Sequence, residues 1–446
     1  MPELADLCSR AIDAAEGDEQ VEAFAEESRR TQVRARELEV ESLTFSETRG
    51  LGVRLIAGGR VGYAYAADPS PDDVTALVAS ARESASFTEP DAANELPALT
   101  PIEPLPGLYR EEQAALETER KVALALDLER LAVGSHPEVR RVDSVGYGDS
   151  VGRVALASTR GGPLEYARTD CWSFVSSLAE RNGETQTGFS FRLARGMATL
   201  EWEIAAREAA QRAARLLGGA KPGTERLPVL LDPIAAVAFL GVLSSSLSAE
   251  SVQKGRSPLE GLVQTEMASS EVTIVDDGRL PEGPALAPFD DEGVATGRTV
   301  LVEGGTLRGF LHNSYTAARG GERSTGNAAR ASYRGAPGVS PSNLYLEPGE
   351  ATFEDLLRRV PRAVYVQDVT GLHSGANPVS GEFSVGATGL RVEGGALAQP
   401  LREMTIASTL LELLKAVAAK GSDLRFPGGG IGAPTVLVAE MTVAGS

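Results

Sequence analysis

The sequence predicts an α+β protein with two domains, an N-terminal mixed α/β sheet domain and a β-rich C-terminal domain. Its 446 residues are about three times the length of a typical domain. Its 48 glycines and 25 prolines indicate many turns, which is typical of β-rich chains. Strand-like runs alternate with a few helical patterns and no fixed-period repeat occurs, so a propeller or a solenoid is disfavoured.

The first 90 residues predict an αββββα unit. Residues 4–15 have the amphipathic pattern of a helix, and a second helix carries Asp72 and Asp73 in its first turn and extends to Ser86. Four strands are expected between these helices, the last two joined at Gly58-Gly59: residues 21–28, 31–40, 51–56 and 61–66.

Residues 91–220 predict a linker followed by a central region of helices and strands. The stretch 89–107 is rich in proline and acidic residues and has no usable period, so we expect an extended surface connection. A long helix is expected over 110–134, because its leucines recur on one stripe. The remaining elements are strands within 138–195 and a helix over 200–217.

Residues 221–446 predict the β-rich C-terminal domain. Gly-Gly pairs at Gly304-Gly305 and Gly394-Gly395 indicate hairpins over 299–310 and 383–401. The other expected elements are strands over 227–231, 272–275 and 435–443, and helices over 234–248 and 406–417. The strand over 272–275 is expected to stop at Asp276-Asp277-Gly278, which has the composition of a turn.

Charge and cysteine content narrow the function classes. Asp and Glu number 62 against 43 Lys and Arg, and the net charge of -19 disfavours direct binding to nucleic acid or to an anionic membrane. Cys8 and Cys171 are the only cysteines, so neither a disulfide framework nor a cysteine zinc knuckle is expected. The first residues lack the pattern of an export signal, and the longest apolar run, 234–243, is about half of a membrane span. We therefore expect a soluble cytoplasmic protein.

Common catalytic motifs are weak in this chain. Its three histidines, His136, His312 and His373, are scattered without the spacing of a zinc site, and we expect His136 in an exposed loop and His312 in a structural or interface role. Ser150 lies in a GDSVG string, but a strand-like run follows it where a nucleophile elbow needs a helix. We therefore expect Ser150 in a hairpin turn.

One irregular loop concentrates polar side chains. Within residues 373–384 it carries His373, Ser374, Asn377, Ser380, Glu382 and Ser384. Two interpretations are open from the residues alone. The side chains satisfy backbone groups within a tight connection, or they bind or catalyse.

Long ordered motifs in the second half resemble the TldD/TldE (PmbA) family of metallopeptidases. They include VTIVDDGRLPEG, DDEGVATGRTVLVEGGTLRGFLHNSYTAAR, SPSNLYLEPG and GLHSGANPVSGEFSVGATGLRVEGG. The resemblance implies proteolysis by a cytoplasmic TldD/TldE heterodimer that degrades or trims unfolded or modified peptides, including microcin precursors and an antitoxin. The HSGANPVSGEFSVGA string is similar to the TldE, or PmbA, branch.

The resemblance also implies that this chain is the metal-free subunit. In the TldD branch an HExxxH helix and a later cysteine hold zinc, whereas the matching positions here are about Leu240, Gly241 and Ser245. We therefore expect no metal on this chain, zinc on a TldD-like partner, and a peptide substrate. The loop at 373–384 and the Asp276-Asp277 turn are our candidates for interface or substrate contacts. A second departure is Ala407-Ser408-Thr409-Leu410, where the family commonly has AGNL.

Two rival functions stay open. An autonomous hydrolase would use Ser374 or Ser380 as nucleophile and His373 as base. A purely structural or regulatory scaffold would pair with a partner, or with itself as a homodimer when isolated, without proteolysis. The family's old label as a modulator of DNA gyrase gains no support from a charge of -19 as direct DNA binding.

Overall fold

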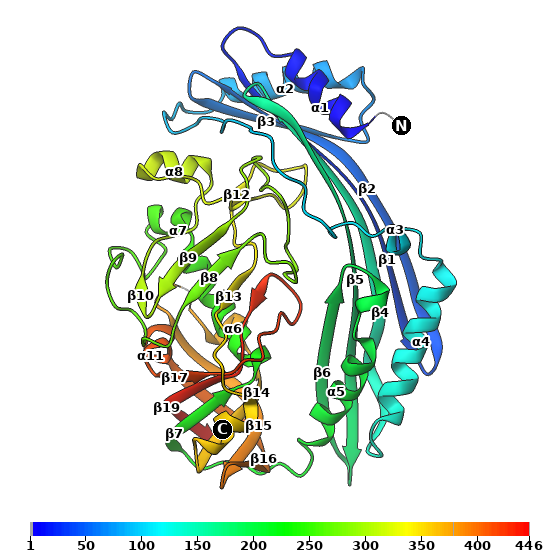
Figure 1. Ribbon diagram of the computed structural model, residues 1–446, viewed down its shortest axis with the longest axis vertical. Coiled ribbons are helices and arrows are strands. Elements are labelled where there is room, and N and C mark those ends of the chain that lie inside the picture. Colours follow the sequence, from blue (N-terminus) through cyan, green and yellow to red (C-terminus); the bar gives the residue numbers. More distant parts are fainter. Residues whose placement is uncertain (1–2, 378, 446) are drawn as a thin grey trace.

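In the computed structural model, which describes residues 3–377 and 379–445, a long curved sheet from the first half of the chain runs alongside a β-rich second half (Figure 1). This arrangement confirms the predicted α+β class and the two-part organisation. One sheet passes through both predicted segments 1–90 and 91–220, and the boundary between them stays a prediction. Among the helices that the structure describes, none has the length and hydropathy needed to cross a membrane.

The N-terminal sheet has the strand order β3-β2-β1-β4-β5-β6, and all its neighbours are antiparallel. Its strands are β1 (Gln20–Arg36), β2 (Glu39–Ala57), β3 (Arg60–Ala67), β4 (Val139–Ser158), β5 (Gly161–Arg181) and β6 (Glu184–Ala194). Most buried apolar residues at alternate positions face one side, where the helices cover them, while Phe24 and Leu156 on the other side pack against Phe289 and Tyr333 of the second half. These helices are α1 (Leu4–Asp13), α2 (Asp73–Ser86), α4 (Thr118–Gly134) and α5 (Trp202–Ala214).

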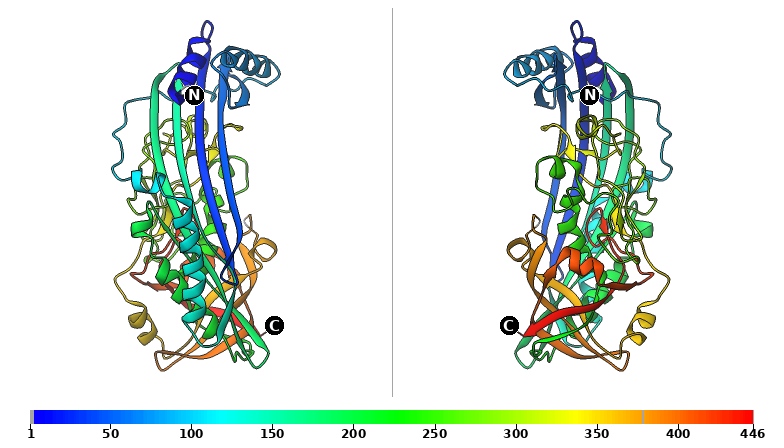
Figure 2. Two further views of the ribbon diagram at one scale, coloured as in Figure 1. Left: turned by 90° about the vertical axis from the view of Figure 1, so that its right-hand side faces the viewer. Right: turned by 90° about the vertical axis from the view of Figure 1, so that its left-hand side faces the viewer.

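The helices therefore lie on the convex face of the sheet, and the concave face is turned toward the second half of the chain (Figure 1). In the left view of Figure 2, α4 lies over the long strands of the sheet. The predicted helix over 110–134 is two helices, α3 (Glu111–Ala114) and α4, because the backbone of Glu117 is extended. The 3₁₀ turn η1 (Met197–Thr199) precedes α5.

Two predictions about turns in the N-terminal sheet are wrong. The first hairpin does not turn near Arg29-Arg30: β1 continues to Arg36, and the turn lies at Glu37-Leu38, where both residues have positive φ. Charged residues such as Arg29 and Arg30 on an exposed sheet face have the composition of a turn. The actual turn at Glu37-Leu38 was missed because it lacks the glycine that usually marks a hairpin. Ser150 lies in the middle of β4, paired with Arg30 and Asp170, so it is neither in a turn nor on a nucleophile elbow.

The second half contains a closed ring of five strands. The strand order is β16-β15-β14-β7-β19, and β16 also pairs with β19, which closes the ring, while β17 extends it. The strands are β7 (Glu225–Leu231), β14 (Arg362–Thr370), β15 (Glu382–Glu393), β16 (Ala396–Thr409), β17 (Val417–Lys420) and β19 (Val436–Gly445). The hairpin at Gly394-Gly395 and the closing strand are confirmed.

A second sheet of five short strands packs beside this ring. It consists of β8 (Ile274–Asp277), β9 (Arg298–Glu303), β10 (Thr306–Leu307), β13 (Leu344–Leu346) and β18 (Ile431–Gly432), and β11 (Ala328–Ala329) pairs separately with β12 (Gly338–Val339). The hairpin at Gly304-Gly305 is confirmed. The short helices are α6 (Pro233–Ser244), η2 (Ser245–Leu247), α7 (Ala249–Gln253), α8 (Ser314–Gly320), α9 (Phe353–Arg358), α10 (Leu372–Gly375) and α11 (Leu410–Lys415).

The predicted helix over 406–417 is wrong at both ends. Ile406 belongs to strand β16 and Val417 to β17, so that only α11 is helical. The apolar stripe is nevertheless buried as one group, since all its members belong to the same hydrophobic core. A strand, a short helix and a second strand bury the same side chains as one continuous helix, and periodicity alone does not distinguish them.

A buried ionic network ties the sheet to the second half of the chain. The Arg54 guanidinium contacts Glu22 on β1 at 2.6 Å and Glu292 at 2.8 Å. Arg330 pairs with the other oxygen of Glu22 and donates to the Tyr63 hydroxyl at 3.1 Å. All four charged side chains are less than one-tenth exposed, and each charge has an opposite partner, as burial requires.

A second contact between the halves lies at the other end of the sheet. Glu208 on α5 accepts from Arg192 on β6 at 2.6 Å and pairs with Arg425 of the C-terminal half. Burial opposes the charge of Glu208, but the two guanidinium groups outweigh it and lower the pKa of the carboxyl to about 2. Close by, Arg212 of α5 binds Asp232, the N-cap of α6, at 2.7 Å.

Replacing Arg54 by Met should destabilise the protein strongly, because Glu22 and Glu292 stay buried without their shared partner. We expect a loss of about 3–5 kcal/mol of unfolding free energy, measured by urea titration. The control is Arg141→Met on the same sheet, whose ion pair with Glu180 is exposed and should contribute at most about 1 kcal/mol. Equal effects of the two variants would contradict the network's role.

Glu208→Gln should make stability less dependent on acid pH. The folded pKa of Glu208 lies below its ordinary value of 4.5, so its charge stabilises the fold above pH 4.5, and this contribution is lost as pH falls toward 2. This shift in the pKa of Glu208 corresponds to a contribution of about 3 kcal/mol to the unfolding free energy at neutral pH. Urea titrations should therefore show a difference in unfolding free energy between wild type and Glu208→Gln that becomes smaller between pH 4.5 and pH 2. The control is Glu354→Gln, on the exposed face of α9, which should have the same unfolding free energy as wild type.

Candidate functional site

Helix α6 carries the positions that sequence comparison placed opposite a zinc-binding motif. Its first turn is capped by Asp232, whose carboxylate accepts from the Ile234 amide at 2.9 Å. Leu240 is buried, Gly241 has no side chain, and the Ser245 hydroxyl at the following turn donates to the Val242 carbonyl at 3.1 Å. The hydroxyl is therefore used within its own helix end.

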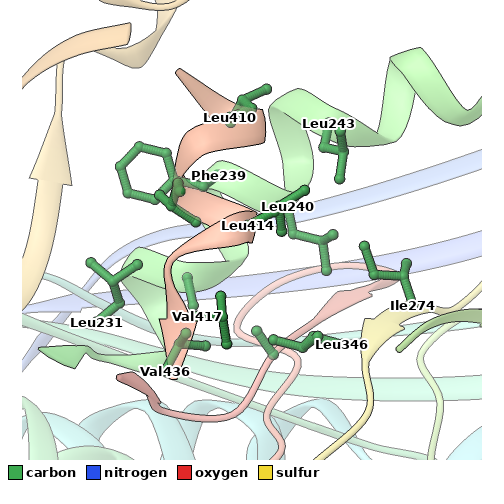
Figure 3. Close-up of a pocket in the computed structure, with 13 residues that line it drawn as sticks. Leu231, Phe239, Leu240, Leu243, Ile274, Leu346, Leu410, Leu414, Val417 and Val436 are labelled. Carbon is green, nitrogen blue, oxygen red and sulfur yellow. The ribbon is translucent and has the colours of Figure 1, made fainter. Parts of the chain in front are cut away.

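Leu240 lines a cavity of about 40 Å³ between α6, α11 and the adjoining strands (Figure 3). Figure 3 shows hydrocarbon side chains pointing toward one another around it. The thirteen lining residues are Leu231, Ala236, Phe239, Leu240, Leu243, Ile274, Leu346, Leu410, Leu413, Leu414, Val417, Ala433 and Val436. Zinc is held by imidazole, thiolate or carboxylate groups, and none of these side chains offers one. The residues of this pocket therefore do not fit a zinc ion.

The predicted polar loop lies against this helix. The Phe383 ring packs on Phe239 of α6 with centroids 4.6 Å apart, and the amide of Leu410 on α11 donates to Gly381 at 2.8 Å. Leu372 and Ala376 pack on the same hydrophobic core. The structure thus anchors the loop by its apolar residues, next to the positions that correspond to the metal motif.

The polar side chains of the loop point away from the core. His373, Ser374, Asn377, Ser380, Glu382 and Ser384 are all exposed. The Asn377 side chain accepts from the amides of Val379 and Ser380, and the Ser380 hydroxyl lies 3.5 Å from Glu382. Asn377 therefore acts as a local turn residue, which fits the structural interpretation of this part of the loop.

The Ser-His arrangement of the rival hydrolase is not assembled in this conformation. The Ser374 hydroxyl donates to the Gly371 carbonyl at 3.3 Å. Between residues 3–377 and 379–445, no hydrogen bond joins His373 to Ser374 or Ser380. The structure offers no geometry that favours either serine as an activated nucleophile.

Asp276 and Asp277 lie at the end of strand β8, and the predicted stop before them is therefore wrong. Asp276 is 1% exposed and accepts from the side chains of Asn327 and Ser342, both at 2.7 Å. Burial raises the pKa of Asp276, and these hydrogen bonds oppose that rise. Asp277 accepts from the Arg279 amide at 2.9 Å. These carboxylates hold neighbouring loops together, and within the described chain they make no hydrogen bond to the polar loop.

Sequence reasoning missed the charged residues that join the two halves. Glu22 and Arg330 are 308 positions apart, and no spacing rule connects them. The one available signal was a charge inside an otherwise apolar strand, as at Glu22 and Arg54. His312 is 9% exposed, in agreement with its predicted structural role.

A cleft of about 450 Å³ opens between β6, α5 and residues 424–427. Among the described strands, β6 is the last of its sheet and pairs with β5 alone, and its residues 190–193 line this opening. The charges of Arg192, Glu208 and Arg425 satisfy one another inside it. The cleft also borders Ile234 in the first turn of α6, and an extended chain can pair with an open strand edge of this kind.

Three family models match consecutive parts of the chain. Residues 21–85 match the PmbA/TldA metallopeptidase domain 1, residues 111–217 the central domain, and residues 224–445 the C-terminal domain. The metalloprotease PmbA of Escherichia coli O157:H7 is 26% identical over 451 residues, which cover 99% of this chain and 96% of the relative.

Solved structures show the same architecture. A structure from Thermotoga maritima, described as a modulator of a DNA gyrase, has a TM-score of 0.91 and 28% identity, covering 98% of this chain and 99% of that chain. TldE from Thermococcus kodakarensis has the same TM-score at 22% identity and covers 99% of both chains, which supports the fold alone. The three matching models, which cover nearly the whole chain, and the full-length relative establish that the chain belongs to the PmbA/TldD metallopeptidase family.

Proposed function

We propose that this chain is the metal-free, PmbA/TldE-like subunit of a heterodimeric peptidase, and that a TldD-like partner supplies the zinc. The observation that carries the proposal is the hydrocarbon cavity at Leu240, at the position where a zinc-binding subunit would present ligands. A helix that buries leucine and phenylalanine there stabilises the fold of this chain, and metal chemistry is left to another subunit.

The role of this subunit is to hold peptide substrates and to complete a chamber with its partner. The open edge of β6 suits an extended peptide, because main-chain hydrogen bonds to a strand edge depend little on side-chain identity. Such binding favours unfolded or modified peptides over folded proteins, which supports a role in peptide degradation, trimming or maturation. The exposed loop at 373–384 is our candidate for contacts with the partner or the substrate.

The free cysteines support a cytoplasmic location. Cys8 and Cys171 are both buried, and burial raises the pKa of each thiol to about 12. Thiols of this kind are protonated and inert at neutral pH. The protein thus needs no oxidising compartment, and its proposed partner and substrates share the cytoplasm with it.

A zinc and peptidase assay tests this proposal directly. We expect the isolated chain to retain less than a tenth of an equivalent of zinc after dialysis and to leave an unstructured reporter peptide intact. Adding a family member with an intact HExxxH motif should yield hydrolysis that EDTA abolishes and zinc restores. Stoichiometric zinc in the isolated chain, or no gain from the added subunit, would sink the proposal.

The rival hydrolase is tested in the same assay. If the isolated chain cleaved the peptide, His373→Ala should abolish the activity, while His136→Ala, at the end of α4, should leave it unchanged. We expect that the isolated wild-type chain does not cleave the peptide. Thermal unfolding of the two isolated variants checks that both are folded.

A further inference from the structure

The concave face of the N-terminal sheet carries a strip of arginine and aromatic side chains. Strand register places Arg34, Gly146, Phe174 and Phe191 in one row across β1, β4, β5 and β6. The next row places Trp172 beside Gly148. We call Arg30, Arg34, Trp172, Phe174 and Phe191 the arginine–aromatic strip.

Two glycines make the strip possible. A Cβ atom at Gly148 would lie 2.3 Å from the Trp172 ring, and one at Gly146 would lie 2.8 Å from the Phe174 ring. Both rings therefore lie directly on the bare backbone of β4. Above them the Arg30 guanidinium lies 4.6 Å from the Trp172 ring centre, and that of Arg34 lies 5.7 Å from Phe174, which are cation–π distances.

The strip is open to solvent, and at one end Phe191 lines the cleft beside β6 together with Pro284 and Phe426 of the second half. The helices that pack on the sheet lie on its convex face, as the cores under α1, α2, α4 and α5 show. Arg30 and Arg34 are exposed, and Trp172, Phe174 and Phe191 are only partly buried. Across residues 3–377 and 379–445, neither guanidinium has an ion pair, in contrast to Arg54 and Arg330.

We propose that the arginine–aromatic strip binds an extended peptide segment that carries carboxylate and apolar side chains. The carboxylates pair with the free guanidinium forks, and the apolar side chains pack on the rings of Trp172, Phe174 and Phe191. The choice of an acidic occupant follows from local charge complementarity, since the described strip presents two guanidinium groups that make no ion pair. The inference rests on the proposed function and names a class of substrate for it.

A single-stranded nucleic acid is the alternative occupant of such a surface, because bases stack on aromatic rings. It would need a positive groove that follows several phosphates, whereas the strip offers two guanidinium groups on a strongly acidic protein. The observations therefore favour the peptide.

The test uses the full chain without a partner or metal, so its outcome is independent of the zinc and peptidase assay. The probes are fluorescein-labelled 12-residue peptides with the repeat Gly-Glu-Phe-Ser, matched peptides with Lys or Gln in place of Glu, and a 12-nucleotide oligothymidylate. Fluorescence anisotropy measures affinity. A Trp202→Phe variant leaves Trp172 as the one tryptophan, and its emission should change when the Glu peptide binds.

The matched variants differ only in the face of the sheet that they change. Arg30→Ala with Arg34→Ala alters the concave face, while Arg29→Ala with Arg153→Ala removes two exposed arginines of the convex face, where Arg29 pairs with Val151 and Arg153 with Glu27. We expect the first pair to weaken binding of the Glu peptide roughly tenfold or more, and the second pair to change it less than about twofold. Thermal unfolding checks that both double variants are folded.

The proposal is overturned if the Lys peptide or the oligothymidylate binds more tightly than the Glu peptide. It is also overturned if the Glu peptide fails to bind, or if both double variants weaken it equally. Binding that prefers Glu over Gln and Lys, is lost in the concave-face variant alone and quenches or shifts Trp172 emission supports it.

Discussion

The architecture depends on one buried contact, in which Arg54 binds Glu22 of the sheet and Glu292 of the second half while Arg330 completes the pairing. Buried ion pairs contribute little net stability compared with apolar packing, but breaking one is costly because a charge is left without a partner. Such a contact therefore defines geometry more than it adds free energy. It holds one end of a long sheet against the C-terminal half, and the pair of Glu208 with Arg425 does the same near β6.

Because charged contacts and one apolar cluster around Phe24, Leu156 and Tyr333 hold the sheet at particular points, the rest of its concave face need not collapse onto the second half. The convex face is covered by helices and buries its apolar residues, whereas the concave face keeps exposed arginines over half-buried rings. The guanidinium groups cover one side of the rings and stabilise them there by cation–π attraction. The same separation leaves the cleft beside β6 open. Both features fit a subunit that binds flexible chains while its partner performs the chemistry.

The candidate site was predictable in part, and the reason differs from residue to residue. The loop at 373–384 was recognised by its concentration of polar residues, and the structure places it against α6 through Phe239 and Phe383. Asp276 has the composition of a turn but lies buried at a strand end, where Asn327 and Ser342 satisfy it. Its partners are 51 and 66 positions away, and local sequence carries no record of them. Trp172 and Gly148 were unremarkable until strand register placed the ring on the glycine.

Residue identity and short-range spacing were enough to predict the class of the fold, the hairpins at Gly-Gly pairs, the lack of ligand-type side chains at Leu240, Gly241 and Ser245, and the family motifs. A sequence contains these properties directly. The length of β1, the split of the helix predicted over 406–417, the ionic network and the arginine–aromatic strip became visible in the folded chain alone. Each of these arises from residues far apart in the chain, and the free energy that selects them comes from burial and charge pairing across elements, which no local pattern specifies.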